Sequence, residues 1–283
     1  MGNERVVVTG GAGMLARDLV KVFTNQYEVT CLPRAALDVA DENAVLSCFR
    51  ELQPNVVLHA AAYTQVDRAE MESAEAFRVN ASGARAVARA SAAVGAFLVA
   101  YSTDFVFSGL ASAPYGEEAQ TGPLCAYGRS KLAGELAVQE ETDRYAVLRT
   151  AWLYGAGGGC FPKTMLRLAA AADKPLAVVC DQFGSPTFSG DLAALTVAVV
   201  RLRCQGLYHA VNEGVVSWFE FAREVLRCAG VARGVTAIGS DELDRPAKRP
   251  AYSALCTRRL RSAIRLAPRS WREALADFLE EIR

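Results

Sequence analysis

Tyr127 and Lys131 have the types and spacing needed for proton transfer. They stand four residues apart, which places the phenol and the ammonium on one face if this segment is helical. A tyrosine with an ordinary pKa near ~10 transfers protons poorly at neutral pH, and a nearby cation lowers that pKa by stabilising the phenolate. The pair therefore predicts a general acid–base site.

Polar residues upstream of this pair add further candidates. Thr103 and Asp104 follow the strand-like run at residues 97–100. They are therefore expected at the carboxyl end of a parallel strand, where open α/β sheets bind their ligands. A Tyr-x-x-x-Lys pair alone arises often by chance. The pair, a strand-end threonine and a glycine-rich turn in this order are far more specific.

The glycine-rich turn covers residues 9–13, directly after a β-branched run and directly before a helical pattern. Gly10 and Gly13 allow the backbone to approach a pyrophosphate, which then lies at the positive end of the helix. The spacing is Gly-x-x-Gly-x-x-Ala, with Ala16 in place of the third glycine of the general fingerprint. Alone, this turn is equally consistent with a plain βα connection, but its place as the first βα unit favours a dinucleotide cofactor.

The end of the second predicted strand bears on the choice of cofactor. An acidic residue there binds the ribose hydroxyls of NAD, whereas an arginine accommodates the 2′-phosphate of NADP. This strand ends in Leu32-Pro33-Arg34, and Glu28 comes too early in it. Arg34 therefore favours NADPH, with NADH as the alternative and a solvated surface arginine as the competing interpretation.

Strand-like and helix-like segments alternate through the first half of the chain. Apolar runs at 6–8, 29–32, 56–58, 97–99 and 146–148 are separated by helical patterns at 15–23, 42–52, 73–94 and from about 127. This predicts an α/β fold, with a doubly wound parallel sheet (Rossmann) in residues 1–155. Residues 156–283 are expected to form mainly a smaller C-terminal α/β substrate-binding lobe. Strands near 178–180 and 207–211 are candidates to return to the main sheet.

Composition limits the class of protein. The 283 residues carry 31 Lys+Arg and 31 Asp+Glu, and this balance argues against a general nucleic-acid binder. No apolar stretch reaches the ~18–20 residues that span a membrane, and the N-terminus lacks the features of a signal peptide. The eight cysteines form no Cys-x-x-Cys pair, and His59 and His209 are the two histidines. We therefore expect a cytoplasmic chain with reduced cysteines, no membrane association and no metal site.

Six segments carry a resemblance to a known family. They are residues 9–15 (TGGAGML), 59–67 (HAAAYTQVD), 101–107 (YSTDFVF), 127–135 (YGRSKLAGE), 149–155 (RTAWLYG) and 181–187 (DQFGSPT). Together they resemble the extended short-chain dehydrogenase/reductases, and more closely the dTDP-4-dehydrorhamnose reductase family. The likeness covers most of the chain. Phe105 departs from the pattern, because tyrosine is frequent there and its hydroxyl is missing here.

The resemblance implies a role for each matching residue. Tyr127 would donate the proton, Lys131 would bind the nicotinamide ribose, and Thr103 would hydrogen-bond the keto oxygen of the sugar. The implied substrate contacts are Val66, Thr103, Asp104 and Trp152, although Trp152 could equally be a core aromatic. Asn80 would support the lysine. The implied cofactor-binding residues are Gly10, Gly13, Met14, Leu15, Arg34, Asp38, Val39, Ala61, Ala62, Tyr63, Thr64, Asn80, Tyr127 and Lys131.

The activity implied is reduction by NAD(P)H of the C4 keto group of a nucleotide-linked sugar, dTDP-4-dehydrorhamnose above all, to give dTDP-rhamnose. Two alternatives remain: another extended family member such as a nucleotide-sugar epimerase, or a non-catalytic regulatory subunit like the methionine adenosyltransferase β subunit. Four cations of the second lobe could bind a diphosphate or simply be solvated: Arg245, Lys248, Arg249 and Arg258. The amphipathic helices of the second lobe can pack equally well against the first lobe or against another copy of the chain. A homodimer is therefore possible.

Overall fold

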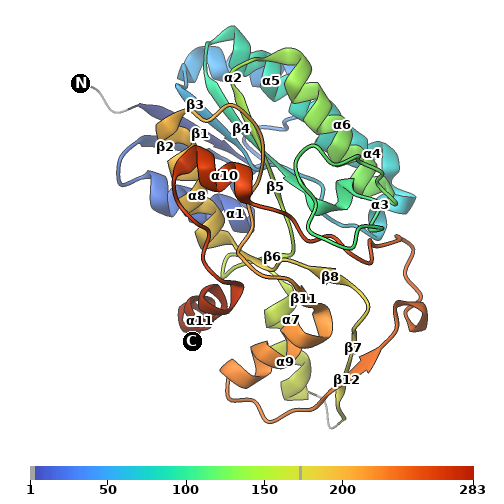
Figure 1. The fold of residues 1–283 in the computed structure, drawn as a ribbon. Coiled ribbons are helices and arrows are strands. Elements are labelled where there is room, and N and C mark those ends of the chain that lie inside the picture. The colour runs from blue at the N-terminus through green and yellow to red at the C-terminus, as the bar shows by residue number, and fades with distance from the viewer. Residues whose placement is uncertain (1–3, 172–173) are drawn as a thin grey trace.

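A parallel sheet forms the centre of the larger lobe, which lies uppermost in Figure 1. The structure is a computed structural model that describes residues 4–171 and 174–283. Six strands lie in the order β10-β5-β4-β3-β1-β2, and every neighbouring pair is parallel. Their bounds are β1 (Arg5–Thr9), β2 (Glu28–Leu32), β3 (Val56–His59), β4 (Phe97–Thr103), β5 (Tyr145–Thr150) and β10 (Gly206–His209). The predicted doubly wound sheet is confirmed.

Helices cover both faces of this sheet, which is why its strands are apolar on both sides. Val6 and Val8 of β1 face α1 (Met14–Phe23), α8 (Ser189–Leu202) and α10 (Arg258–Ile264). Val7 faces α2 (Glu42–Leu52), α5 (Gly83–Ala93) and α6 (Ala126–Glu141) on the opposite side. Because β1 and β3 are neighbours while β2 lies beyond β1, the chain reverses its winding direction there. A ligand crevice is expected at this point, outside the strands' carboxyl ends.

The helix predicted over residues 73–94 is interrupted. After α3 (Arg68–Met71), the chain forms α4 (Ser73–Phe77), a π-helical turn η1 (Arg78–Ser82) and then α5. Helix α6 packs very closely on this turn, since a Cβ on Gly134 would lie 2.1 Å from the carbonyl oxygen of Asn80. Single π-helical turns occur frequently at functional sites, because they redirect one side chain without ending the helix.

The second lobe has its own core. Helices α7 (Phe161–Ala171), α9 (Trp218–Cys228) and α11 (Trp271–Glu281) pack around Tyr154, Phe221 and Trp271. Three short strand pairs complete it: β7 (Leu176–Val179) with β12 (Val235–Ile238), β8 (Phe183–Gly184) with β11 (Val216–Ser217), and β6 (Leu153–Tyr154) with β9 (Thr187–Phe188). Two 3-10 turns are η2 (Asp104–Val106) and η3 (Ser240–Glu242).

The chain crosses between the lobes more than once after residue 155. The segment expected near 207–211 joins the main sheet as β10, beside β5. The segment near 178–180 does not return, because β7 pairs with β12 and packs Leu176 and Val178 into the core of the second lobe. Helices α8 and α10 also return to cover the sheet. Nowhere in the described ranges is a helix long and apolar enough to cross a membrane.

Candidate active site

The glycine-rich turn after β1 has the backbone that a dinucleotide requires. Gly10 has a φ of +72°, and a Cβ there would lie 2.5 Å from the Cα of Ala61, so only glycine fits. Gly13 is the N-cap of α1 and provides no side chain for its first amides. Those N–H groups can therefore bind a pyrophosphate. Met14 and Leu15 form the first turn of the same helix.

The loop after β3 is fixed by Asn80 from the π-helical turn. The Asn80 amide accepts a hydrogen bond from the Tyr63 N–H (2.8 Å) and donates to the Tyr63 carbonyl (3.0 Å). It also donates to the Ser130 hydroxyl (2.9 Å), which in turn donates to the Tyr127 carbonyl (2.8 Å). Asn80 thus links two parts of the site. It holds the loop of Ala61, Ala62, Tyr63 and Thr64, and through Ser130 it contacts helix α6, which carries Lys131.

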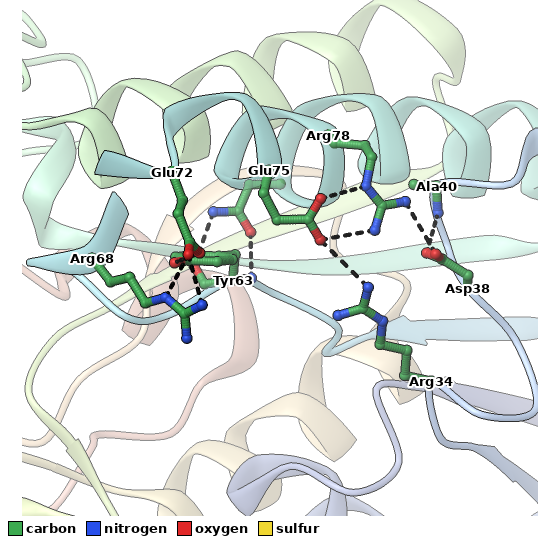
Figure 2. Close-up of polar contacts among 9 residues, drawn as sticks. Arg34, Asp38, Ala40, Tyr63, Arg68, Glu72, Glu75 and Arg78 are labelled. Atoms are coloured by element: carbon green, nitrogen blue, oxygen red, sulfur yellow. Dashed lines mark hydrogen bonds and ion pairs between the residues drawn. The ribbon is translucent and has the colours of Figure 1, made fainter. Parts of the chain in front are cut away.

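A charged network lies beside the expected adenosine site (Figure 2). Asp38 accepts from the Ala40 N–H (3.1 Å) and from Arg78 (3.0 Å). These contacts, the Ala40 bond first, lower the pKa of Asp38. Val39 is buried against Gly83. Arg34 lies 3.4 Å from Glu75, and its side chain is 73% exposed.

Tyr127 and Lys131 lie in the first turns of α6, as their spacing predicts. The Lys131 ammonium donates to the Tyr101 carbonyl (2.7 Å), and burial lowers its pKa to about 8. Burial also raises the pKa of Tyr127, partly opposed by a hydrogen bond with Thr103. The expected lowering of the Tyr127 pKa by Lys131 is wrong here: burial raises this pKa, and Lys131 is not among the groups that shift it. Tyr127 is therefore protonated at neutral pH.

Thr103 and Asp104 meet Tyr127 at the carboxyl end of β4. The Thr103 hydroxyl donates to Asp104 (3.0 Å) and accepts from the Phe105 N–H (3.2 Å). Burial raises the pKa of Asp104 to about 6, and the nearby Ser253 hydroxyl and the hydrogen bond from Thr103 oppose the rise. Gly128 allows this contact between β4 and α6, since a Cβ there would lie 2.3 Å from the Phe105 carbonyl oxygen.

A cavity of about 170 Å³ opens beside these groups, between the two lobes. Phe105 and Ser253 line it, and the Phe105 ring meets Tyr127 edge-on at 5.6 Å. The second lobe supplies an aromatic and aliphatic wall, and two arginines. These lining residues are Trp152, Phe161, Met165, Val178, Trp218, Arg245 and Arg249. The cavity thus combines an apolar wall with two cationic side chains and adjoins Phe105, which contacts Tyr127.

Trp152 lies in this wall in an unusual conformation. Its φ is +46°, in the left-handed region, which costs a non-glycine residue about 1–3 kcal/mol. Its indole stacks on Trp218 with ring centroids 3.5 Å apart, and a Cβ on Gly184 would lie 2.4 Å from it. The sequence analysis did not identify Trp218, because it belongs to no recognisable motif. The one local signal is the Ser-x-x-Glu capping pattern of residues 217–220, which predicts that a helix starts at Trp218.

Asp67 also escaped the sequence prediction, although it stands beside Val66 in a family-like segment. Both Asp67 oxygens accept from Arg249, at 3.0 and 2.7 Å, which ties the C-terminal loop to the first lobe. Lys248 and Arg258, two of the proposed diphosphate cations, are exposed and do not line the cavity. The remaining two, Arg245 and Arg249, do.

Buried His59 is accounted for by the fold. Its Nδ1 lies 2.9 Å from the Thr9 hydroxyl, in hydrogen-bonding contact. Burial, with the Lys131 charge, lowers the His59 pKa to about 3, so the ring is neutral. A neutral, satisfied imidazole at the end of β3 supports the neighbouring glycine turn and does not act as a proton donor at neutral pH.

Comparison with known proteins agrees with this arrangement. The family model described as the RmlD substrate binding domain matches residues 4–283. The chain belongs to the RmlD substrate binding domain family. Among curated relatives, a dTDP-4-dehydrorhamnose reductase of Streptomyces griseus is 44% identical, over 96% of this chain and 92% of the relative. The spore coat polysaccharide biosynthesis protein SpsK of Bacillus subtilis is 39% identical, over 98% and 97%.

Solved structures extend this family likeness. A dTDP-4-dehydrorhamnose reductase from Bacillus anthracis, in complex with NADP, is 39% identical with a TM-score of 0.96, over 99% of this chain and 100% of that one. A UDP-glucose 4-epimerase from Thermus thermophilus is 22% identical with a TM-score of 0.83, over 99% of each chain. The epimerase shares the fold alone, whereas the RmlD family members share both fold and sequence.

Proposed function

We propose that this RmlD family protein reduces the C4 keto group of dTDP-4-dehydrorhamnose with NADPH, giving dTDP-rhamnose. One observation carries the proposal. The ring of Tyr127, whose phenol burial keeps protonated, packs edge-on against Phe105, and Phe105 lines the inter-lobe cavity at the carboxyl edge of the sheet. The glycine turn that fits a dinucleotide belongs to this same edge. The names of the curated relatives and the NADP complex of a similar structure support the same activity.

The side chains divide the chemistry between them. When bound, the reduced nicotinamide supplies a hydride to the keto carbon. Tyr127 donates its phenolic proton to the keto oxygen, so that negative charge is neutralised as it forms. Thr103, which is hydrogen-bonded to Tyr127, would also hydrogen-bond that oxygen and orient it. Lys131, held by the Tyr101 carbonyl, binds the ribose hydroxyls of the nicotinamide half.

The sugar nucleotide would bind in the inter-lobe cavity. Trp152 and Val66 would contact the deoxysugar, and Asp104 would accept hydrogen bonds from its hydroxyls. Arg249 already pairs with Asp67. Arg245 is the better ligand for the diphosphate, because it lines the cavity and no carboxylate of the described residues pairs with it within 4 Å.

The cofactor preference is proposed from Arg34 and from the NADP complex of the similar structure. The exposed Arg34 side chain can reach a 2′-phosphate, and NADH, which lacks that group, would bind more weakly. We also propose that the protein works in the cytoplasm, because its eight cysteines are all free thiols, as in a reducing compartment.

A substrate panel tests this function. NADPH oxidation is measured with dTDP-4-dehydrorhamnose, with other dTDP-linked 4-keto-6-deoxy sugars and with UDP-glucose. We expect one NADPH oxidised per dTDP-4-dehydrorhamnose consumed, with Tyr127→Phe as the inactive control. Interconversion of UDP-sugars without net oxidation would identify an epimerase. Cofactor binding without turnover across the panel would identify a regulatory subunit.

A further inference from the structure

Arg34 stands at the edge of the proposed dinucleotide site. It follows β2 by two residues, and the Leu32 carbonyl at the end of that strand accepts a hydrogen bond from the Gly11 N–H (3.0 Å). The end of β2 and the glycine turn are thus held together. In this fold the adenosine half of a dinucleotide lies over the end of this strand. An Arg34 side chain that is 73% exposed can therefore turn toward the ribose.

Glu75 is held in place from the other side. Arg78 donates two hydrogen bonds to its carboxylate, from Nε (2.6 Å) and Nη2 (2.9 Å), in a two-pronged arrangement. Arg78 is itself fixed by Asp38 through Nη1 (3.0 Å). Figure 2 shows Glu75 between the guanidinium groups of Arg34 and Arg78. The Arg78 contacts keep the pKa of Glu75 below its ordinary value, so the carboxylate is charged at neutral pH.

The two contacts of Glu75 differ in strength. Its bond to Arg34 is single and long, 3.4 Å, and the arginine is mostly solvated, so this contact contributes little. Arg34 can therefore leave Glu75 for another anion at little cost, whereas Arg78 keeps the Glu75 carboxylate where it is. An incoming phosphate that bound Arg34 would lie close to this fixed negative charge.

We propose that Glu75 determines the preference between NADPH and NADH, because its carboxylate competes with the 2′-phosphate for Arg34. This inference rests on the dinucleotide site of the proposed function. The 2′-phosphate carries between one and two negative charges at neutral pH, like other phosphomonoesters. This phosphate is attracted by the guanidinium of Arg34 and repelled by the carboxylate of Glu75. NADH meets neither effect, so Glu75 narrows the advantage of NADPH and lets the protein use both cofactors.

Direct binding measurements test this inference without any sugar. Dissociation constants for NADPH and NADH are measured by the fluorescence of the bound nicotinamide, for the wild type and for Glu75→Gln. The glutamine can still accept a hydrogen bond from Arg78 but has no charge. We expect the NADPH constant to fall about fivefold, the size of one screened charge interaction near a surface, and the NADH constant to stay within about twofold.

Two further variants define the mechanism. Arg34→Ala should weaken NADPH about tenfold, and in its presence Glu75→Gln should have a smaller effect, because the two residues act on one phosphate. The matched control is Glu118→Gln, which breaks an exposed carboxylate–guanidinium pair with Arg259 (2.8 Å) that is not part of this network. It should change neither constant.

The possible failures are distinct. If Glu75→Gln weakens NADH alone, Glu75 binds the ribose hydroxyls and the inference is wrong. If it weakens both cofactors equally, or changes neither, Glu75 has only a structural role and the inference is again overturned. If the wild type binds neither cofactor, the proposed function itself fails, whatever Glu75 does.

Discussion

Two regions of the molecule hold their ionisable groups in different environments: the proposed catalytic centre around Tyr127, and the partly exposed network of Arg34, Asp38, Glu75 and Arg78, here called the adenosine edge. Lys131 and Asp104 are buried and Tyr127 is half-buried, and burial is the largest cause of each pKa shift, toward about 8 for Lys131 and about 6 for Asp104. At the adenosine edge, Glu75 and Asp38 remain solvated and are paired with Arg78, which helps to keep them charged. Burial in one region adjusts which atoms carry protons. Pairing in the other fixes the charges that a cofactor meets.

The largest predicted effect is the loss of the proton donor in the enclosed region. Tyr127→Phe should lower kcat for ketone reduction about 10³-fold, within the range for removal of a general acid. Cofactor affinity should change little, because Lys131 remains. Steady-state NADPH oxidation and a fluorescence titration measure the two quantities. Activity close to that of the wild type would show that the proton comes from another group.

The second prediction concerns the wall that encloses this region. Trp218→Ala removes the ring on which Trp152 stacks, and should raise KM for the sugar nucleotide about tenfold with a smaller change in kcat. Trp218→Phe keeps an aromatic face and should recover most of the affinity. If the phenylalanine variant is as weak as the alanine variant, stacking on Trp152 is not the reason for the effect.

The sequence predicted the cofactor side of this molecule better than the cavity wall. The glycine turn and the Tyr-x-x-x-Lys pair are short segments whose geometry is local, so spacing alone places them. The partners in the wall come from distant segments: Trp218 meets Trp152, and Asp67 meets Arg249. Nothing in the neighbouring sequence specifies those contacts, which depend on how the second lobe packs.

Helical periodicity also concealed one feature of the fold. Residues 73–94 have a continuous helical pattern, yet a π-helical turn forms at 78–82. The cause lies in another helix, since Gly134 of α6 brings its backbone against Asn80. A pattern read along one segment cannot include such a contact. The sequence likewise pointed to Arg34 but could not indicate its partner Glu75, which lies on a different element.

The third prediction uses the raised pKa of Asp104. The wild-type kcat/KM should decline as pH falls through about 6, where Asp104 becomes protonated and loses the charge that accepts hydrogen bonds from Thr103 and from the sugar. Asp104→Asn should be less active, about tenfold, and should lose this inflection. The measurement is a pH–rate profile. An unchanged inflection in the variant would assign it to another group.

Asp104 should also affect stability, with a defined sign. Its pKa rises from 3.8 to about 6 on folding, so its contribution to stability is fully present below 3.8 and is lost as pH rises through about 6. Asp104→Asn should therefore raise Tm at pH 8 by about 2–4 °C, and this gain should disappear near pH 4. Thermal unfolding monitored by circular dichroism at both pH values tests the prediction, and a gain that is equal at both would contradict it.

The smallest predicted effect is that of ionic strength, which should change cofactor binding at the adenosine edge but not the catalytic rate. Raising ionic strength from about 0.05 to 0.5 M should weaken NADPH binding about threefold, because the adenosine edge is exposed to screening ions. NADH binding should change less, and kcat should stay constant, because the catalytic groups are enclosed. Titrations and rate measurements at both salt concentrations provide the comparison. A kcat that falls with NADPH affinity would show that the two regions are not electrically independent.

The central claim is that this RmlD family protein carries out a net reduction at C4 of the sugar. The most direct test supplies NADPH deuterated at both C4 positions, together with dTDP-4-dehydrorhamnose, and examines the product by mass spectrometry and NMR. The account predicts dTDP-rhamnose with one deuterium at C4 of the sugar for each NADPH oxidised. A product without deuterium at that carbon, or a converted sugar with no NADPH consumed, would contradict it.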